Sequence, residues 1–280
     1  MDGGPSRTAM MAAGGRAAHL VVDSEPYLFR DTLAAELLGA RAEEVLGYHR
    51  QFGDHVVLRG TRAQVNARSS YTEARVSAGF RQYVILGAGL DTFAYRSPLA
   101  REIAVFEVDH PATQQWKREL LAAARIDGAA ARFVGVDFER DDLTAELAAH
   151  GFNPEMPALV SWLGVSMYLT ESAIAATLAV LRGFAPGTEL VMEYALPAEL
   201  RDESGTAYAE FALPAAAEQG EPWLSYYSPE TLSELLGKHG FTVAEHVSQR
   251  DAVDPALWRR TDSLHPADLC RLVRAVVVAD

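Results

Sequence analysis

The sequence has a single cysteine, Cys270, among its 280 residues. No disulfide can therefore form within the chain, and no cluster of thiolates can bind a metal ion. Positive charge is also scarce, since 25 Lys and Arg stand against 38 Asp and Glu and leave a formal net charge of −13. This balance argues against a nucleic acid as partner, because proteins that bind polyanions usually present a basic face to the phosphates.

Long apolar runs are missing as well. Nowhere do about 18 apolar residues follow one another, the minimum for a membrane-spanning helix. The first twenty residues lack the apolar segment behind a basic start that is typical of a secretory signal. We therefore expect a cytoplasmic protein that does not insert into a membrane, and the lone cysteine fits a reducing compartment.

Three signatures of nucleotide or metal sites are absent too. A third glycine in the dinucleotide-binding pattern would fall at position 92, where the chain has Thr92. No glycine-rich turn is followed by Lys-Ser or Lys-Thr, so a phosphate-binding P-loop is not predicted. No His and carboxylate residues stand at the spacing of metal ligands, and we expect no metal.

What the sequence does have is a change of pattern near residue 82. Residues 5–77 show helical spacing, with an apolar stripe at Leu33, Ala34, Leu37 and Leu38, and Asp23-Ser-Glu-Pro reads as a start signal for a helix. From 82 onward apolar runs alternate with helical segments, which is typical of βαβ units and a parallel sheet. We predict an α/β fold with seven strands, the last antiparallel, within a single domain over 1–280 made of a helical cap at 1–80 and a core at 81–280. The predicted strands are 83–87, 103–108, 131–136, 158–166, 188–194, 241–247 and 270–278, and the predicted helices of the core are 111–125, 140–150, 171–184 and 228–239.

Residues 195–227 fit neither pattern and are rich in aromatic side chains. Insertions at the carboxyl ends of strands in open α/β sheets are where substrates are usually bound, which favours a lid or pocket wall here. The alternative is that these rings only pack on the N-terminal helices. The candidate substrate-binding residues are Tyr194, Tyr208, Phe211, Trp223 and Tyr227.

The turn Gly87-Ala88-Gly89 follows a short apolar run that is typical of a strand buried on both faces. Glycines there allow a ligand to approach the backbone. The next strand ends in Asp109, about 20 residues on, where an acidic side chain can accept hydrogen bonds from both ribose hydroxyls. The alternative is that Asp109 only caps the helix beginning at Pro111. Glu107 shares its side of the strand and either joins it or lies deeper.

The third predicted strand is followed by Asp137 and Phe138. The carboxylate can accept from an adenine amino group, and the phenyl ring can pack against the purine. Three successive strand ends therefore predict a site for an adenosyl group.

Several runs, taken in order, resemble the leucine carboxyl methyltransferase-like family of enzymes that depend on S-adenosylmethionine (SAM). They are Arg68-Ser-Ser-Tyr, Val84-Ile-Leu-Gly-Ala-Gly-Leu-Asp-Thr with Tyr95-Arg96, Phe106-Glu-Val-Asp-His-Pro, Val136-Asp-Phe and Leu163-Gly-Val-Ser-Met-Tyr-Leu. The resemblance implies a seven-stranded, Rossmann-like class I methyltransferase fold. It implies SAM as cofactor, with Arg68 on its carboxylate, Gly87 on the methionine backbone, Asp109 on the ribose, and Asp137 with Phe138 on the adenine.

The family includes phosphatase carboxyl methyltransferases and bacterial O-methyltransferases of polyketide pathways. The former carry a glutamate before the Gly-Val pair, where this chain has Leu163. We therefore expect a small-molecule acceptor, methylated on a carboxyl or hydroxyl oxygen. The alternatives are a SAM-binding scaffold, a cyclisation or rearrangement without methyl transfer, and a nicotinamide-dependent oxidoreductase, which Thr92 disfavours.

A carboxylate acceptor needs no base, whereas an alcohol or phenol would profit from one. His110, beside Asp109, is the candidate nearest the cofactor, and Tyr168 can orient an acceptor oxygen. A histidine is more often structural or at the surface than catalytic, and a tyrosine packed in the core is about as common as one that orients an acceptor. The other histidines considered as a base are His19, His246 and His265.

Overall fold

The computed structural model describes residues 7–138, 140–218 and 220–279. Their centre is a seven-stranded sheet in the order β3-β2-β1-β4-β5-β7-β6. β1 to β5 are parallel, and β7 runs antiparallel to both of its neighbours. The predicted strands, including the antiparallel last one, are therefore confirmed. They are β1 (Gln82–Leu86), β2 (Ala104–Asp109), β3 (Arg132–Gly135), β4 (Leu159–Trp162), β5 (Glu189–Ala195), β6 (Phe241–Val247) and β7 (Cys270–Val277).

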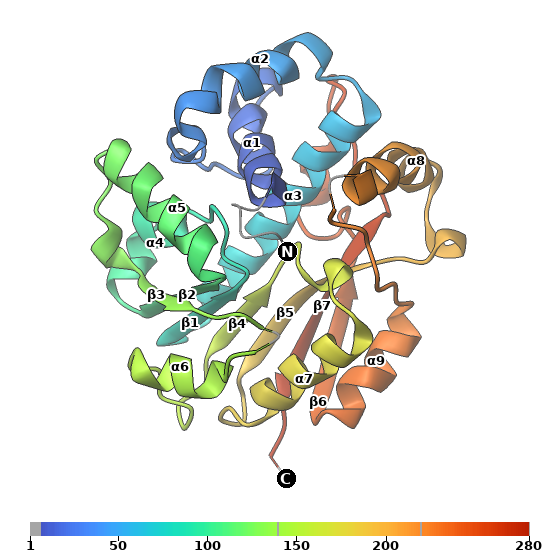
Figure 1. The fold of residues 1–280 in the computed structure, drawn as a ribbon. Helices are drawn as coiled ribbons and strands as arrows, with labels where there is room; N and C mark the ends of the chain where they lie inside the picture. The colour runs from blue at the N-terminus through green and yellow to red at the C-terminus, as the bar shows by residue number, and fades with distance from the viewer. Residues whose placement is uncertain (1–6, 139, 219, 280) are drawn as a thin grey trace.

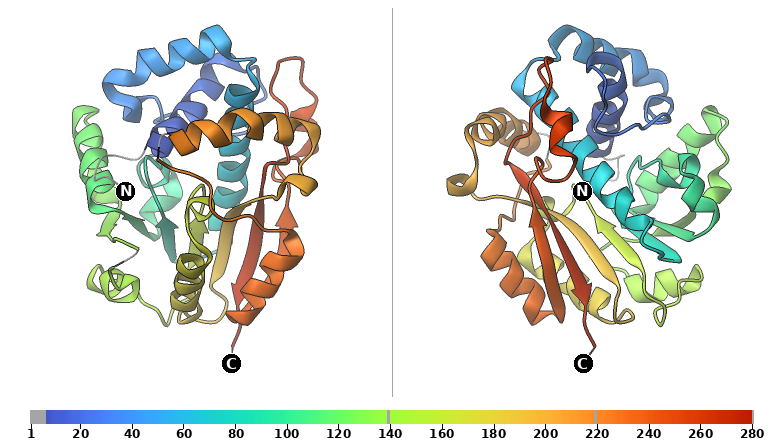
Figure 2. Two further views of the ribbon diagram at one scale, coloured as in Figure 1. Left: turned by 45° about the vertical axis from the view of Figure 1, so that its right-hand side comes forward. Right: turned by 180° about the vertical axis from the view of Figure 1, so that it is seen from behind.

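Helices cover both faces of this sheet (Figures 1 and 2). Alternate residues of each strand point to opposite faces, so that Val84 packs in one hydrophobic core and Ile85 in the other. One face packs against α6 (Leu143–Ala149), α7 (Glu171–Arg182) and α9 (Pro229–Lys238), and the other against α3 (Val56–Val76), α4 (Phe93–Arg96) and α5 (Pro111–Ala123). The 3-10 helices after β1, β2, β5 and β6 are Pro98–Arg101, Gly128–Ala130, Ala198–Leu200 and Pro255–Trp258.

The predicted helices of the core are confirmed with shorter ends. β4 is also shorter than predicted, because Gly164 adopts φ +69°, a left-handed conformation that ends the strand and suits glycine. β1 and β4 are neighbours whose connections leave in opposite directions along the sheet. Such a reversal opens the crevice in which α/β proteins bind ligands, so the ends of β1 and β4 mark where a site is expected.

The N-terminal segment is helical, as predicted, and lies above the carboxyl ends of the strands (Figure 1). It consists of α1 (Arg7–Val22), a 3-10 helix (Glu36–Arg41), α2 (Ala42–Phe52) and the first half of α3. The prediction of a helix starting at Asp23-Ser-Glu-Pro is wrong. Residues 23–35 are irregular, because the Asp23 carboxylate binds Arg62 and His19 instead of capping a helix.

The insertion at 195–227 contains a helix that the sequence did not predict, α8 (Glu203–Glu218). It packs on α3 where Gly60 leaves room, since a Cβ there would lie 2.6 Å from Cδ1 of Tyr208. Pro214 lies inside this helix, and because proline is unfavourable in a helix interior, the sequence pattern does not predict a helix here. Within the described ranges, no helix combines the length and the apolar character needed to cross a bilayer.

Candidate functional site

The turn after β1 forms a cradle in the backbone. Gly87 and Gly89 have φ of +68° and +47°, and the N–H groups of Gly87 and Ala88 both donate to the Val108 carbonyl, at 2.8 and 3.0 Å. A Cβ at Gly87 would lie 2.3 Å from the Val165 side chain, and one at Gly89 would lie 2.9 Å from the Cβ of Ala9. Both positions require glycine, and α1 therefore lies directly against the turn.

Asp109 reaches this turn from the end of β2. Its Oδ2 accepts from the Gly89 N–H at 2.6 Å and its Oδ1 from the His110 N–H at 2.7 Å. Burial raises the pKa of the Asp109 carboxyl above its ordinary value, although these two donors favour the charged form. The cap of α5 is His110, whose Nδ1 accepts from Ala112 N–H at 3.2 Å. The alternative that Asp109 caps this helix is thereby wrong.

Asp137 and Phe138 follow the end of β3, the strand beside β2. The Val136 N–H donates to the Asp109 carbonyl at 2.9 Å, so the two strand ends adjoin. Asp137 and Phe138 are half-buried, and the Phe138 ring packs at the margin of the core under α6 and α7. The three strand ends predicted to converge do lie at one edge of the sheet.

Glu107 lies deeper than Asp109 and takes no part in this edge. Lys117 donates to its carboxylate at 2.6 Å and the Tyr95 hydroxyl at 3.1 Å. Both side chains of the Glu107–Lys117 pair are 1% exposed. Tyr95, which belongs to one of the runs that resemble the family, thus donates a hydrogen bond to a buried ion pair.

Arg68 lies inside the protein. From α3 its guanidinium forms an ion pair with Glu193 of β5, and only 13% of its side chain is exposed. A Cβ at Gly164 would lie 2.8 Å from Nη1 of Arg68, so the guanidinium packs on the bare backbone after β4. Gln64, one turn earlier, donates to the other Glu193 oxygen at 2.9 Å. Among the described hydrogen bonds, the Arg68 guanidinium donates from Nη1, and its side chain also lines the cavity described next.

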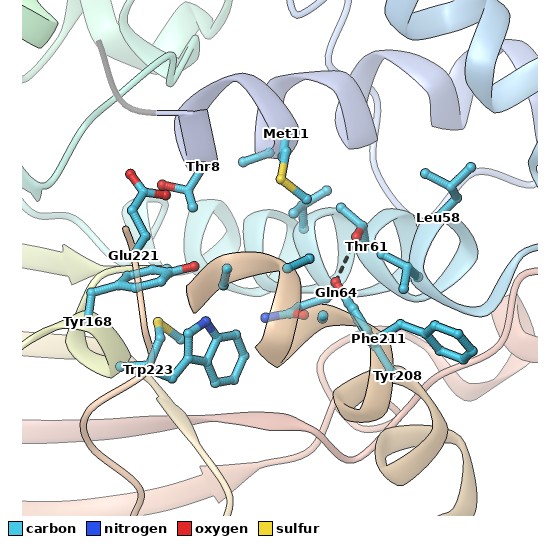
Figure 3. A pocket seen from close by; sticks show the side chains of 18 of the residues that line it. Thr8, Met11, Leu58, Thr61, Gln64, Tyr168, Tyr208, Phe211, Glu221 and Trp223 are labelled. Carbon is cyan, nitrogen blue, oxygen red and sulfur yellow. Dashed lines mark hydrogen bonds between the residues drawn. The ribbon is translucent and has the colours of Figure 1, made fainter. Parts of the chain in front are cut away.

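A cavity of about 330 Å³ opens beside Arg68 and Gly164. Its walls come from α1, α3 and α8, from Tyr48 of α2, and from the segments 164–168 and 221–223 (Figure 3). Figure 3 places Tyr168 and Glu221 toward one end of the cavity and Leu58 and Phe211 toward the other. Its lining includes Thr8, Met11, Tyr48, His55, Leu58, Thr61, Gln64, Arg68, Gly164, Met167, Tyr168, Tyr208, Phe211, Glu221 and Trp223.

The predicted substrate-binding residues divide between two places. Tyr208, Phe211 and Trp223 line the cavity, where they also meet the N-terminal helices: the hydroxyls of Tyr208 and Thr61 are 2.7 Å apart. The insertion therefore forms a wall of the cavity and packs on the N-terminal helices through the same side chains. Tyr194 and Tyr227 instead lie in the core on the opposite face of the sheet. The Tyr194 hydroxyl is 2.9 Å from Nδ1 of His246, so its side chain points away from the cavity.

Of the two predicted catalytic residues, Tyr168 lines the cavity and His110 is exposed beyond it. Burial raises the pKa of the Tyr168 phenol, which therefore keeps its proton and can donate a hydrogen bond. His19 is buried between Asp23 and the Leu28 N–H, and His246 bonds Tyr194 and Ser233. His55, from α3's start, is the histidine that does line the cavity.

Comparison with known proteins decides the family. A model of the leucine carboxyl methyltransferase family matches residues 9–182. The chain is also 31% identical over 299 aligned positions to YktD of Bacillus subtilis, provisionally named a SAM-dependent methyltransferase, and this match covers 97% of each chain. The chain belongs to the leucine carboxyl methyltransferase family.

Two further similarities agree with this membership. A Mycobacterium protein (strain KMS), also provisionally named a SAM-dependent methyltransferase, is 41% identical over 127 residues, which are 44% of this chain and 41% of the relative. The crystal structure of a provisionally named methyltransferase from Thermobifida fusca superimposes with a TM-score of 0.62 at 18% identity, over 99% of this chain and 97% of the other. The methyltransferase fold is thus shared. Family membership favours SAM over a nicotinamide cofactor.

Gln64, Glu193 and Glu221 are not among the residues predicted from the sequence. Glu193 lies 129 residues from Gln64 and 125 residues from Arg68, so no local pattern indicates that these side chains meet. No cluster of His, Cys, Asp or Glu able to hold a metal ion occurs in the ranges that the structure describes.

Proposed function

We propose that this family member transfers the methyl group of SAM to a carboxyl or hydroxyl oxygen of a small, largely apolar, polyketide-like molecule. One observation carries the proposal. Arg68 and Gly164 line the cavity and also stand at the strand ends beside the glycine turn. A cofactor on that turn and an acceptor in the cavity would therefore meet at a shared wall.

The residues at the strand ends fit SAM. The turn at Gly87 and Gly89 would place its backbone beside the methionine part, and the Asp109 carboxylate would accept from the ribose hydroxyls. Asp137 and Phe138 would offer a polar edge and an apolar face to adenine, and the Arg68 guanidinium suits a carboxylate. When bound, SAM supplies a methyl group on a sulfonium, which an acceptor oxygen attacks in line.

The residues that line the cavity would exclude water from the acceptor and position its oxygen. Apolar and aromatic walls such as Met167 and Trp223 keep water from the acceptor, which leaves its oxygen desolvated and more reactive. Tyr168, protonated because burial raises its pKa, would donate to the acceptor and fix the oxygen near Arg68 and Gly164. This positioning suits a carboxylate, which needs no base.

Titration calorimetry with SAM and S-adenosylhomocysteine (SAH) tests the cofactor half. We expect binding near micromolar concentrations, and its absence would contradict the proposal. A panel of small aromatic acids, phenols and alcohols, followed by mass spectrometry, tests transfer: a mass gain of one methyl group must accompany SAH. SAM binding without SAH from any acceptor would favour a family member that does not transfer methyl.

The role of Tyr168 is tested on the first acceptor found. Tyr168→Phe should lower kcat about tenfold, the effect of one lost hydrogen bond in the reacting complex, with SAM affinity unchanged. Tyr226→Phe is the matched control, because Tyr226 lies beside Trp223 and does not line the cavity. Equal kcat in both variants would remove Tyr168 from the site.

A further inference from the structure

Exposed apolar side chains gather where the cavity meets the surface. Eight large hydrophobic residues are exposed among the described residues, and three of them line this cavity: Met11, Tyr48 and Phe211, at 47, 56 and 54% exposure. They come from α1, α2 and α8. Phe52, 45% exposed, extends the group, since its ring centroid is 5.1 Å from that of Tyr48. We call these four residues the apolar rim.

Single exposed apolar side chains are normal on a protein surface, so the position of the rim matters more than its size. The other exposed residues are scattered, as Val21 and Leu224 are, and do not line the cavity. The rim is continuous with the cavity wall: the Phe211 ring packs edge-on against His55, at 5.3 Å between centroids, and both line the cavity. A ligand that leaves the cavity here passes directly onto apolar surface.

Three polar side chains of the lining lie toward the other end. Figure 3 shows Tyr168, Glu221 and Thr8 gathered on one side, well apart from Leu58 and Phe211. Arg68 and Gly164, the residues shared with the strand ends, also belong to the lining. An acceptor must bring its reacting oxygen to these residues, which directs the remainder of the molecule along α3 toward the rim.

The cavity, at about 330 Å³, is at the small end of the range for ligand pockets, roughly 300–1,000 Å³. It holds a head and the start of an apolar body. We propose that the acceptor is amphipathic, with an oxygen-bearing head at Tyr168 and an apolar tail long enough to leave the cavity and lie over the rim. This inference rests on the proposed function and narrows its substrate class to molecules with an extended tail.

Two homologous series test the inference by binding alone, n-alkanoic acids and 4-n-alkylphenols with tails of 4 to 12 carbons. Their Kd values are measured calorimetrically on the full chain saturated with SAH. We expect affinity in at least one series to rise about two- to fourfold per added methylene through the longest tails, because each methylene that lies over the rim still removes part of its surface from water. A plateau at short tails in both series, or no binding in either, would overturn the inference.

Variants place the tail on the surface. Tyr48→Ser with Phe211→Ser should abolish the gain for long tails and leave the shortest members unchanged. Val21→Ser with Val278→Ser is the matched control, with side chains of similar exposure that do not line the cavity, and should behave as the wild type. Identical behaviour of the two double variants contradicts the proposal. Loss of SAH binding by the wild type would mark failure of the proposed function itself, a different result.

Discussion

The Thr92 hydroxyl donates a hydrogen bond of 2.7 Å to the carboxylate of Asp31, which lies 61 residues earlier in the chain. The same carboxylate accepts from Nε of Arg16 at 2.7 Å, and Nη2 of Arg16 donates to the Leu90 carbonyl at 2.7 Å. α1 and the irregular segment after it are thus tied to the residues that follow the glycine turn. Thr92, part of the family-like run, serves this connection.

Thr92→Val should destabilise the protein. The substitution keeps the shape but leaves the fully buried Asp31 carboxylate with one donor fewer, at a cost of about 1–3 kcal/mol in the free energy of unfolding. Thr72→Val is the matched control, because Thr72 is equally buried and its hydroxyl has no partner among the described residues. Urea unfolding should show Thr72→Val unchanged or stabilised. Equal losses in both would contradict the role given to Thr92.

Arg68→Leu should weaken the binding of the amino-acid part of the cofactor and leave the binding of the adenosyl part unchanged. Loss of a charge-assisted contact to the carboxylate should weaken SAH about 10- to 100-fold and leave 5′-methylthioadenosine, which has no carboxylate, unchanged. Arg75→Leu is the control: Arg75 lies on the same helix and pairs with Glu189 of β5 at 2.7 Å, remote from the cavity. Parallel losses for both ligands would show that Arg68 acts on the fold and not on the carboxylate.

Asp109→Ala should weaken the binding of both ligands, unlike Arg68→Leu. Ribose is common to SAH and 5′-methylthioadenosine, so both should weaken together, roughly tenfold or more. Calorimetry of both ligands checks the ratio of the two affinities as well as their size. Asp127→Ala is suitable for comparison, because Asp127 caps the short helix before β3 and should leave both affinities intact. A selective effect on one ligand would contradict the ribose assignment.

His49 should make the protein sensitive to acid. Burial, and the Arg62 guanidinium 3.3 Å from its Nδ1, lower the pKa of His49 to about 4 from an ordinary 6.5. The unfolded chain therefore takes up a proton before the folded one, and stability present above about pH 6.5 falls as the pH drops toward 4, by up to about 1.4 kcal/mol per pH unit.

His49→Gln should flatten this dependence between pH 6.5 and 4, measured by urea unfolding across the range. The exposed His265, replaced in the same way, supplies the comparison and should retain the wild-type slope. An unchanged slope in His49→Gln would show that another group carries the acid sensitivity.

The strands and their antiparallel last member could be predicted because each is a short apolar run bounded by turn residues. The convergence of Gly89 with Asp109 could be predicted too, since parallel strands end at one edge. The ion pair of Arg68 with Glu193 could not, because it joins α3 to β5 across 125 residues of chain. At Asp23 the local pattern predicted a helix that does not form. Its carboxylate instead binds Arg62, a residue far away in the chain that the local pattern does not include.

Tyr194 and its neighbour Glu193 show what strand geometry adds. Consecutive side chains of a strand point to opposite faces, so only one of the two can reach the site. The aromatic residue was chosen from the sequence, yet Glu193 faces Arg68 and Gln64 while Tyr194 faces His246. Composition favours the tyrosine, and nothing local tells which face of β5 the cavity occupies.

The place of β7 governs the order in which the molecule can be completed during synthesis. β7 lies between β5 and β6, although it follows both of them in the chain. At roughly 5–20 residues per second, the 22 residues between Val247 and Cys270 take about 1–5 s, during which β5 presents an open edge and β6 has no neighbour to join. A chain in which β7 is not yet made or is missing therefore exposes strand edges that can pair with other chains.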